Sequence, residues 1–189
     1  APISPQYPLV ELLTMLLVVA SVWRFGFGWQ GFGAIVFTCF LIVLSGIDLR
    51  TQLLPDQLTL PLMWLGLIAA SDNLYFPAKP ALLGAVAGYL SLWIVWWLFK
   101  QLTGKEGMGH GDFKLLAAIG AWTGLKGILP TILLSSVVGA VIGSIWLAMK
   151  GRDRATPIPF GPYLAIAGWI TFFWGEQMVG AYMQFAGLK

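Results

Sequence analysis

The chain has 189 residues, of which 58% are hydrophobic and only 10% are charged, and its mean hydropathy is +0.81. Soluble globular domains carry about 25% charged residues, so this composition excludes an ordinary soluble domain and predicts an all-α, polytopic transmembrane bundle. The net charge of +3 is too small to indicate a nucleic-acid partner. We therefore expect a single membrane-embedded domain over residues 1–189.

Seven apolar segments follow one another along the chain and predict about seven helices. They run roughly over residues 9–23, 32–47, 58–70, 81–99, 115–125, 128–149 and 158–174. A spanning helix needs roughly 17–25 residues, and the third and fifth segments are short for that. These two segments are expected to be either tilted or half-inserted helices beside a polar recess, or buried core helices.

Lysine and arginine indicate how the segments cross the membrane. With the N-terminus on the cytoplasmic side, the basic residues divide into seven cytoplasmic (Arg50, Lys100, Lys105, Lys114, Lys150, Arg152, Arg154) and four external (Arg24, Lys79, Lys126, Lys189). This excess agrees with the positive-inside rule. Two segments separate Asp48 from Asp112, and an even number of crossings returns the chain to the same face. Both aspartates are therefore expected at the cytoplasmic boundary of a multi-pass protein.

Two aspartates at segment ends are candidate catalytic groups. Asp48 follows the second segment, and Asp112 closes a Gly-His-Gly-Asp motif before the fifth. An ionisable group at membrane depth is expensive, and two carboxylates that meet can share one proton, as in aspartic proteases. Simpler interpretations are a helix-ending residue for Asp48 and a helix cap for Asp112. Asp56 is predicted to be the N-cap of the third helix, although spacing alone leaves it as an alternative partner of Asp112.

The glycine-rich loop before Asp112 is predicted to shape a substrate site. Gly109 and Gly111 permit unusual backbone angles and the close approach of an extended peptide. His110 between them is predicted to be a solvated spacer. The single cysteine, Cys39, excludes an internal disulfide and a cysteine-only zinc site, and no His/Cys/Asp cluster has metal-ligand spacing. No metal site is therefore predicted.

Two aspartate motifs together resemble those of the prepilin leader peptidases. Residues 48–62 run from Asp-Leu-Arg through Pro-Asp into Leu-Thr-Leu-Pro-Leu, as in the first family motif. Residues 107–116 read Gly-Met-Gly-His-Gly-Asp-Phe-Lys-Leu-Leu, as in the second. Residues 2–11 and 158–163 are also similar, although without the family the proline and glycine of the latter indicate only a bend before the last helix.

The resemblance implies a bacterial inner-membrane aspartic endopeptidase of type IV pilus and type II secretion systems. Such enzymes cut prepilins and pseudopilins after a glycine at the cytoplasmic face. The resemblance makes Asp48 and Asp112 the catalytic pair and leaves Asp56 outside it. Lys114 joins Gly109 and Gly111 as a candidate substrate-binding or loop-shaping residue. Besides these protein substrates, membrane lipid is an expected partner.

The resemblance implies no cofactor for proteolysis. Relatives carry an earlier membrane segment and a region with paired Cys-x-x-Cys motifs, together with methylation of the new N-terminus by S-adenosylmethionine. Neither feature is found in this sequence, so zinc and S-adenosylmethionine are expected only with an additional N-terminal region. The sequence does not support methylation by this chain alone. It assigns no role to Glu11, Glu106 or His110.

Two other functions remain open from the residues alone. Membrane carboxylates also serve as proton relays, so a proton-coupled transporter is one alternative. Transporters often show inverted repeats and paired broken helices, and no convincing pair is found here. A non-catalytic assembly subunit of a secretion system is the other alternative, and it would need neither aspartate for cleavage.

Overall fold

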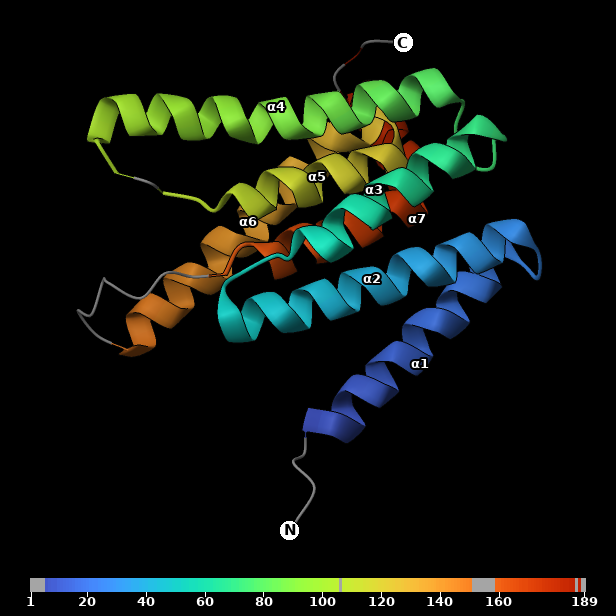
Figure 1. The fold of residues 1–189 in the computed structure, drawn as a ribbon, viewed down its shortest axis with the longest axis horizontal. Coiled ribbons are helices and arrows are strands. Elements are labelled where there is room, and N and C mark those ends of the chain that lie inside the picture. The colour runs from blue at the N-terminus through green and yellow to red at the C-terminus, as the bar shows by residue number, and fades with distance from the viewer. Residues whose placement is uncertain (1–5, 106, 151–158, 186, 188–189) are drawn as a thin grey trace.

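A computed structural model describes residues 6–105, 107–150, 159–185 and 187. Within these residues the chain forms seven α-helices and no strand, which confirms the predicted all-α fold (Figure 1). The helices are α1 (Gln6–Phe25), α2 (Trp29–Thr51), α3 (Asp56–Ser71), α4 (Ala78–Thr103), α5 (His110–Thr123), α6 (Leu125–Lys150) and α7 (Gly161–Phe185). Among them α1, α2, α4 and residues 125–145 of α6 are long and apolar enough to cross a membrane.

The helices extend beyond the apolar segments that predict them. α2 continues to Thr51 and α4 to Thr103, several residues past the last apolar side chain of the pattern. Polar residues at a helix end lie at the membrane boundary, where they keep the backbone hydrogen bonds of the helix without being buried in lipid. Residues in the left-handed conformation then end both helices, Gln52 at φ 55° and Gly104 at φ 69°.

α5 is the buried centre of the bundle. It has 14 residues, 11 of which are buried, and it contacts α3, α4, α6 and α7. In Figure 1 it lies between α4 and α3. The short fifth segment is therefore a buried core helix, as one of the two interpretations predicts. Because α5 is held from several sides, its first turn is a rigid place for a functional group.

α4 and α5 approach each other so closely that only glycine fits between them. A Cβ atom at Gly84 would lie 2.3 Å from the carbonyl oxygen of Gly120, and one at Gly88 would lie 2.6 Å from that of Leu116. The small-xxx-small spacing of Gly84 and Gly88 is typical of close helix packing in membranes. The structure confirms this surface as the contact that positions α5.

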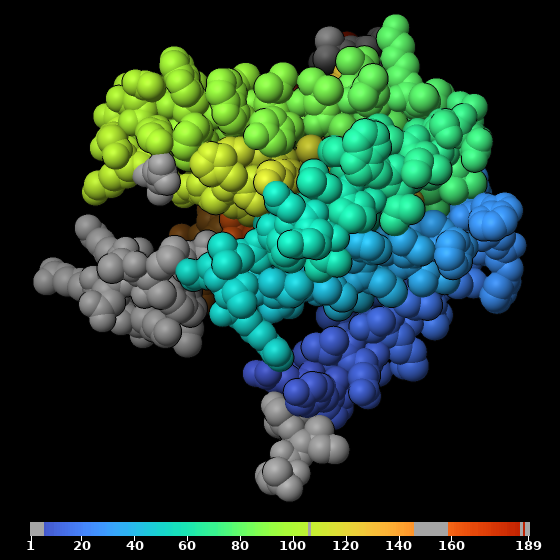
Figure 2. Space-filling view, in the orientation of Figure 1, coloured from blue at the N-terminus to red at the C-terminus, as the bar shows by residue number. Residues whose placement is uncertain are grey.

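α1 lies at the edge of the bundle and packs along α2 (Figure 2). Most of its side chains are exposed, including large apolar ones such as Leu9 at 66%. A small polar network connects α1 to α2 and α7. The hydroxyls of Ser21 and Thr38 are 3.2 Å apart, and the Trp169 indole N–H donates a hydrogen bond of 3.0 Å to the Thr38 hydroxyl. This exposed apolar face is suited to contact with lipid.

Candidate active site

The fold brings Asp48 and Asp112 to the same end of the bundle. Asp48 lies in the last turn of α2 and Asp112 in the first turn of α5. α3 leads the chain away from this end and α4 brings it back, so the end of α2 and the start of α5 both lie toward the left in Figure 1. The structure therefore places both aspartates at one end of the bundle.

Asp48 is held by the start of α7. Its side chain is 4% exposed, and its Oδ2 atom accepts a hydrogen bond of 2.9 Å from the backbone N–H of Gly161, the first residue of α7. The N-terminus of a helix carries a positive partial charge and free N–H donors, so it favours a carboxylate there. A residue 113 positions away in sequence therefore orients the Asp48 carboxylate.

Asp112 is buried beside Asp48 and interacts with it electrostatically. The Asp112 residue is 8% exposed and belongs to α5, which is not among the four helices long and apolar enough to cross a membrane. Burial raises the pKa of the Asp112 carboxyl to about 7, the negative charge of Asp48 adds to the rise, and a hydrogen bond with the backbone of Gly109 opposes it. The nearby negative charge thus makes ionisation of the second carboxyl group harder than that of an isolated one.

Leu54 packs against the starts of α5 and α7, close to the two aspartates. It lies in the connection between α2 and α3 and is partly buried. A Cβ atom at Gly111 would lie 2.7 Å from the Leu54 Cβ, and one at Gly161 would lie 3.3 Å from the Leu54 Cδ1. The structure thus gives Gly111 a packing role, because its lack of a side chain lets the α2–α3 connection lie against the start of α5. Gly109 is the N-cap of α5.

Asp56 does not cap α3, so that prediction was wrong. Pro55 occupies the N-cap position, and Asp56 is the first residue of the helix. No side chain forms a capping hydrogen bond at this helix start. Both Asp56 carboxylate oxygens instead lie 2.7 Å from the Lys114 Nζ. This ion pair connects the first turn of α3 to α5 at the protein surface, where the side chain of Asp56 is 52% exposed and that of Lys114 is 29% exposed. Lys114 therefore links α5 to α3 through this ion pair.

His110 is exposed, but its ring does not extend freely into solvent. It packs edge-on against Trp96 with 4.9 Å between ring centroids and against Phe113 at 5.3 Å. The interpretation of His110 as a mere solvated spacer therefore missed its contact with α4. Glu11 is exposed on α1, and Glu106 lies outside the described residues.

Sequence reasoning missed the contributions of Gly161 and Leu54. The Gly-Pro pair at residues 161 and 162 does mark the start of α7, since glycine and proline both favour helix N-termini, but it does not show which side chain that start holds. Leu54 gave no signal because a leucine before a proline looks like any apolar linker residue. Among the described residues no group of three or more His, Cys, Asp or Glu side chains could hold a metal ion.

Replacing Gly161 with alanine should lower any activity that depends on Asp48. The added Cβ would lie 2.7 Å from the Asp48 Oδ2 and 3.1 Å from its Cγ, so the carboxylate or the start of α7 must move. Misplacing a catalytic group by about 1 Å costs on the order of 100-fold in rate, and we expect a loss of at least tenfold. The initial rate of substrate cleavage measures it. Gly180→Ala, in the same helix with nothing within 4 Å, is the control and should keep the rate.

The architecture is that of a polytopic helical membrane protein with two buried aspartates at one end of the bundle. Comparison with known proteins then identifies its family. The profile of the type IV leader peptidase family matches residues 35–144, which is more than half of the chain and includes both aspartates. The chain belongs to the type IV leader peptidase family. No solved structure matches it significantly.

Several curated relatives are named prepilin leader peptidase/N-methyltransferase. The chain is 80% identical over 188 residues to the one from Xanthomonas campestris pv. campestris, covering all of this chain and 66% of the relative. It is 58% identical to the one from Pseudomonas aeruginosa, with 100% and 65% covered, and 49% identical to the one from Neisseria gonorrhoeae, with 90% and 58% covered. The chain thus spans between 58% and 66% of the length of these relatives, less than two thirds.

Proposed function

We propose that this chain is an aspartic endopeptidase that removes the leader peptide of type IV prepilins and type II secretion pseudopilins, cutting after a glycine. The observation that carries the proposal is the burial of two aspartates, Asp48 and Asp112, at one end of the bundle, with Asp48 oriented by the Gly161 N–H. Membership of the leader peptidase family supports the substrate class. Neither comparison nor structure favours the transporter or the assembly subunit.

In this proposal the two carboxyl groups share one proton and activate water without a covalent intermediate. The ionised member takes a proton from a bound water as it attacks the scissile carbonyl carbon, and the protonated member donates a hydrogen bond to the carbonyl oxygen. The start of α7 fixes Asp48 through the Gly161 N–H, and the rigid α5 fixes Asp112. Both groups are thus oriented before the substrate binds, which reduces the entropy cost of the reaction.

We place the site at the cytoplasmic face of the bacterial inner membrane. The helix ends on the aspartate side carry five basic residues, namely Arg50, Lys100, Lys105, Lys114 and Lys150. The opposite ends carry three, namely Arg24, Lys79 and Lys126. Cytoplasmic segments of membrane proteins are richer in lysine and arginine, so this distribution supports the orientation.

Cleavage should depend on pH with a maximum near or below neutral. The pKa of Asp112 is raised to about 7, mainly by burial, so the pair loses its shared proton as the pH rises through that value. In acid the second carboxylate also becomes protonated and the general base is lost. We therefore expect the initial rate to fall on both sides of the maximum. A rate that stays constant between about pH 4 and pH 9 would exclude a shared proton as the basis of catalysis.

The proposed activity is tested by incubating the purified chain with a prepilin in detergent and following the shortened product on a gel. Cleavage should persist with excess EDTA, because two carboxylates activate water without a metal ion. Serine- and cysteine-directed reagents should have little effect. Loss of cleavage in EDTA that is restored by adding a divalent metal would instead indicate a metal bound by the same carboxylates.

A further inference from the structure

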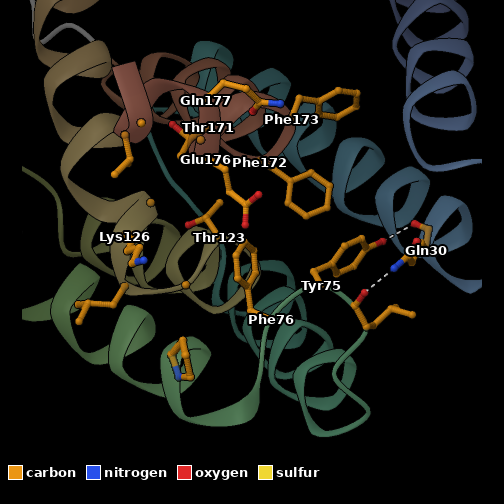
Figure 3. Close-up of a pocket in the computed structure, with 18 of the residues that line it drawn as sticks. Gln30, Tyr75, Phe76, Thr123, Lys126, Thr171, Phe172, Phe173, Glu176 and Gln177 are labelled. Atoms are coloured by element: carbon orange, nitrogen blue, oxygen red, sulfur yellow. Dashed lines mark hydrogen bonds between the residues drawn. The ribbon is translucent and has the colours of Figure 1, made fainter. Parts of the chain in front are cut away.

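A large cavity lies at the end of the bundle opposite the aspartates. Its volume is about 860 Å³, and it is formed by the end of α5, the starts of α4 and α6, the connection between α3 and α4, and the middle of α7 (Figure 3). Gln30 of α2 lines the cavity, whereas Asp48 lies 18 residues further along the same helix, a separation of about 27 Å at 1.5 Å per residue. The cavity is therefore separate from the candidate active site.

The charged side chains of the cavity are mostly positive. Arg24, Lys79 and Lys126 line it against a single carboxylate, Glu176, and all four residues are exposed. Among the described residues none of these four forms an ion pair with another. The Arg24 guanidinium lies 5.5 Å from the centroid of the Phe25 ring and donates a hydrogen bond of 3.4 Å to the Phe173 carbonyl oxygen. With three basic side chains and one acidic side chain, the cavity favours the binding of an anionic group.

The starts of α4 and α6 add to this positive field. Lys79 lies in the first turn of α4 and Lys126 in the first turn of α6, so each lysine sits beside the free N–H groups of a helix N-terminus. Helix N-termini favour phosphate and carboxylate groups through these donors and the helix dipole. An anionic group at this end of the cavity would therefore meet both side-chain and backbone donors.

The interior of the cavity is largely aromatic and apolar but contains one unsatisfied polar group. The rings of Phe76, Phe172 and Phe173 line it (Figure 3). Thr171 also lines it, is 3% exposed, and its hydroxyl has no hydrogen-bond partner within the described part of the chain. A buried hydroxyl without a partner costs about 1–3 kcal/mol, so a hydrogen-bond acceptor supplied to it by a ligand would stabilise the bound state.

The rim of the cavity is continuous with the lipid-facing surface. Leu83 of α4 and Leu125 of α6 line the cavity and are themselves 42% and 46% exposed. Both helices are long and apolar enough to cross the membrane, so exposed leucines on them are suited to contact with acyl chains. A molecule in this cavity can therefore have one part in the basic site and another part among lipid tails.

We infer that this cavity binds an anionic phospholipid from the leaflet on the side away from the aspartates. The phosphate contacts Lys79 and Lys126 at the two helix starts, with Arg24 across the cavity. An acyl chain occupies the aromatic interior, and an ester or glycerol oxygen of the lipid accepts the hydrogen bond of the Thr171 hydroxyl. Basic pockets between transmembrane helices recognise lipid head groups by the same combination of charge and apolar surface.

The test is a titration of the purified chain in a neutral detergent, with thermal unfolding as the readout. The probes are dioleoyl phosphatidylglycerol, dioleoyl phosphatidylcholine with the same acyl chains, and water-soluble glycerol phosphate. We expect phosphatidylglycerol to raise the Tm at a concentration at least tenfold lower than phosphatidylcholine, because only its head group has a net negative charge. Native mass spectrometry should show one phosphatidylglycerol retained per chain.

Matched charge variants localise the effect. Lys79→Gln combined with Lys126→Gln should raise the half-saturating concentration of phosphatidylglycerol at least tenfold. Arg50→Gln combined with Lys105→Gln removes the same charge from the aspartate end and should leave that concentration unchanged. Both pairs are exposed, so folding of the free protein should be retained.

Three outcomes would overturn the proposal. Equal half-saturation by the two lipids would show that the head-group charge is not recognised. Equal losses in the two double variants would place the lipid elsewhere. A full Tm rise with glycerol phosphate alone would assign the cavity to a soluble anion. None of these readouts requires peptidase activity, so they are independent of the proposed function.

Discussion

Asp48→Asn and Asp112→Asn should each lower prepilin cleavage by a factor of about 10² to 10⁴, the range that general acid–base catalysis contributes. Asparagine keeps the size of the side chain, but it neither ionises nor holds an exchangeable acidic proton. With either aspartate replaced, the two side chains can no longer share a proton. The remaining carboxyl group cannot act as general base and general acid at the same time. The initial rate of formation of the shortened prepilin measures the loss, with the Tm of each variant showing that it is folded.

Asp56→Asn is the matched control for these two substitutions. It lies in the same region and loses the same charge, but its carboxylate pairs with Lys114 at the surface. Exposed ion pairs contribute about 0–1 kcal/mol, so most of the cleavage should remain. An inactive Asp56→Asn variant beside an active Asp48→Asn variant would make Asp56 the partner of Asp112 and refute the proposed pair.

Gly84→Val should destabilise the protein by about 3 kcal/mol, the upper end for overpacking a core. The new Cβ would lie 2.3 Å from the Gly120 carbonyl oxygen and 2.7 Å from the Gly124 carbonyl carbon, both of which are backbone atoms. No side chain can rotate away, so α4 must separate from α5 and the first turn of α5 loses its support. Equilibrium unfolding in sodium dodecyl sulfate, followed by tryptophan fluorescence, measures the change.

Gly46→Val is the control for the packing argument. Gly46 also lies inside a long membrane helix, but a Cβ there meets nothing within 4 Å. Valine is slightly better than glycine in a helix, so the free energy of unfolding should change by less than about 1 kcal/mol. Equal destabilisation by the two substitutions would mean that helix propensity, rather than the α4–α5 contact, determines the effect.

The sequence predicts the helices well because apolar runs in a membrane protein leave few alternatives to a helix. The Gly84-x-x-x-Gly88 spacing is also typical of close helix packing, and α5 lies against these two glycines. Helix ends are less predictable, as α7 shows by continuing to Phe185, well past the apolar segment that ends near residue 174. An apolar run predicts where a helix lies but not where it ends, because the helix continues as long as its backbone hydrogen bonds are satisfied.

The parts of the site that escape prediction depend on contacts between distant residues. The aspartates stand out in sequence because charged groups are rare here, and parity of the segments brings them to one end. That Gly161 donates to Asp48 follows only from the three-dimensional position of α7. Asp56 illustrates the opposite error, since a good local capping signal is overridden by Lys114, 58 residues away.

The most direct test of the central claim is the intact mass of a prepilin after incubation with this chain, with its Asp112→Asn variant, and without protein. If Asp48 and Asp112 form a peptidase site, the wild-type chain alone converts the prepilin to one product, shortened by hydrolysis of the single bond after the leader glycine. An unchanged prepilin mass with the folded wild-type chain, or the same product with the folded Asp112→Asn variant, would contradict the account.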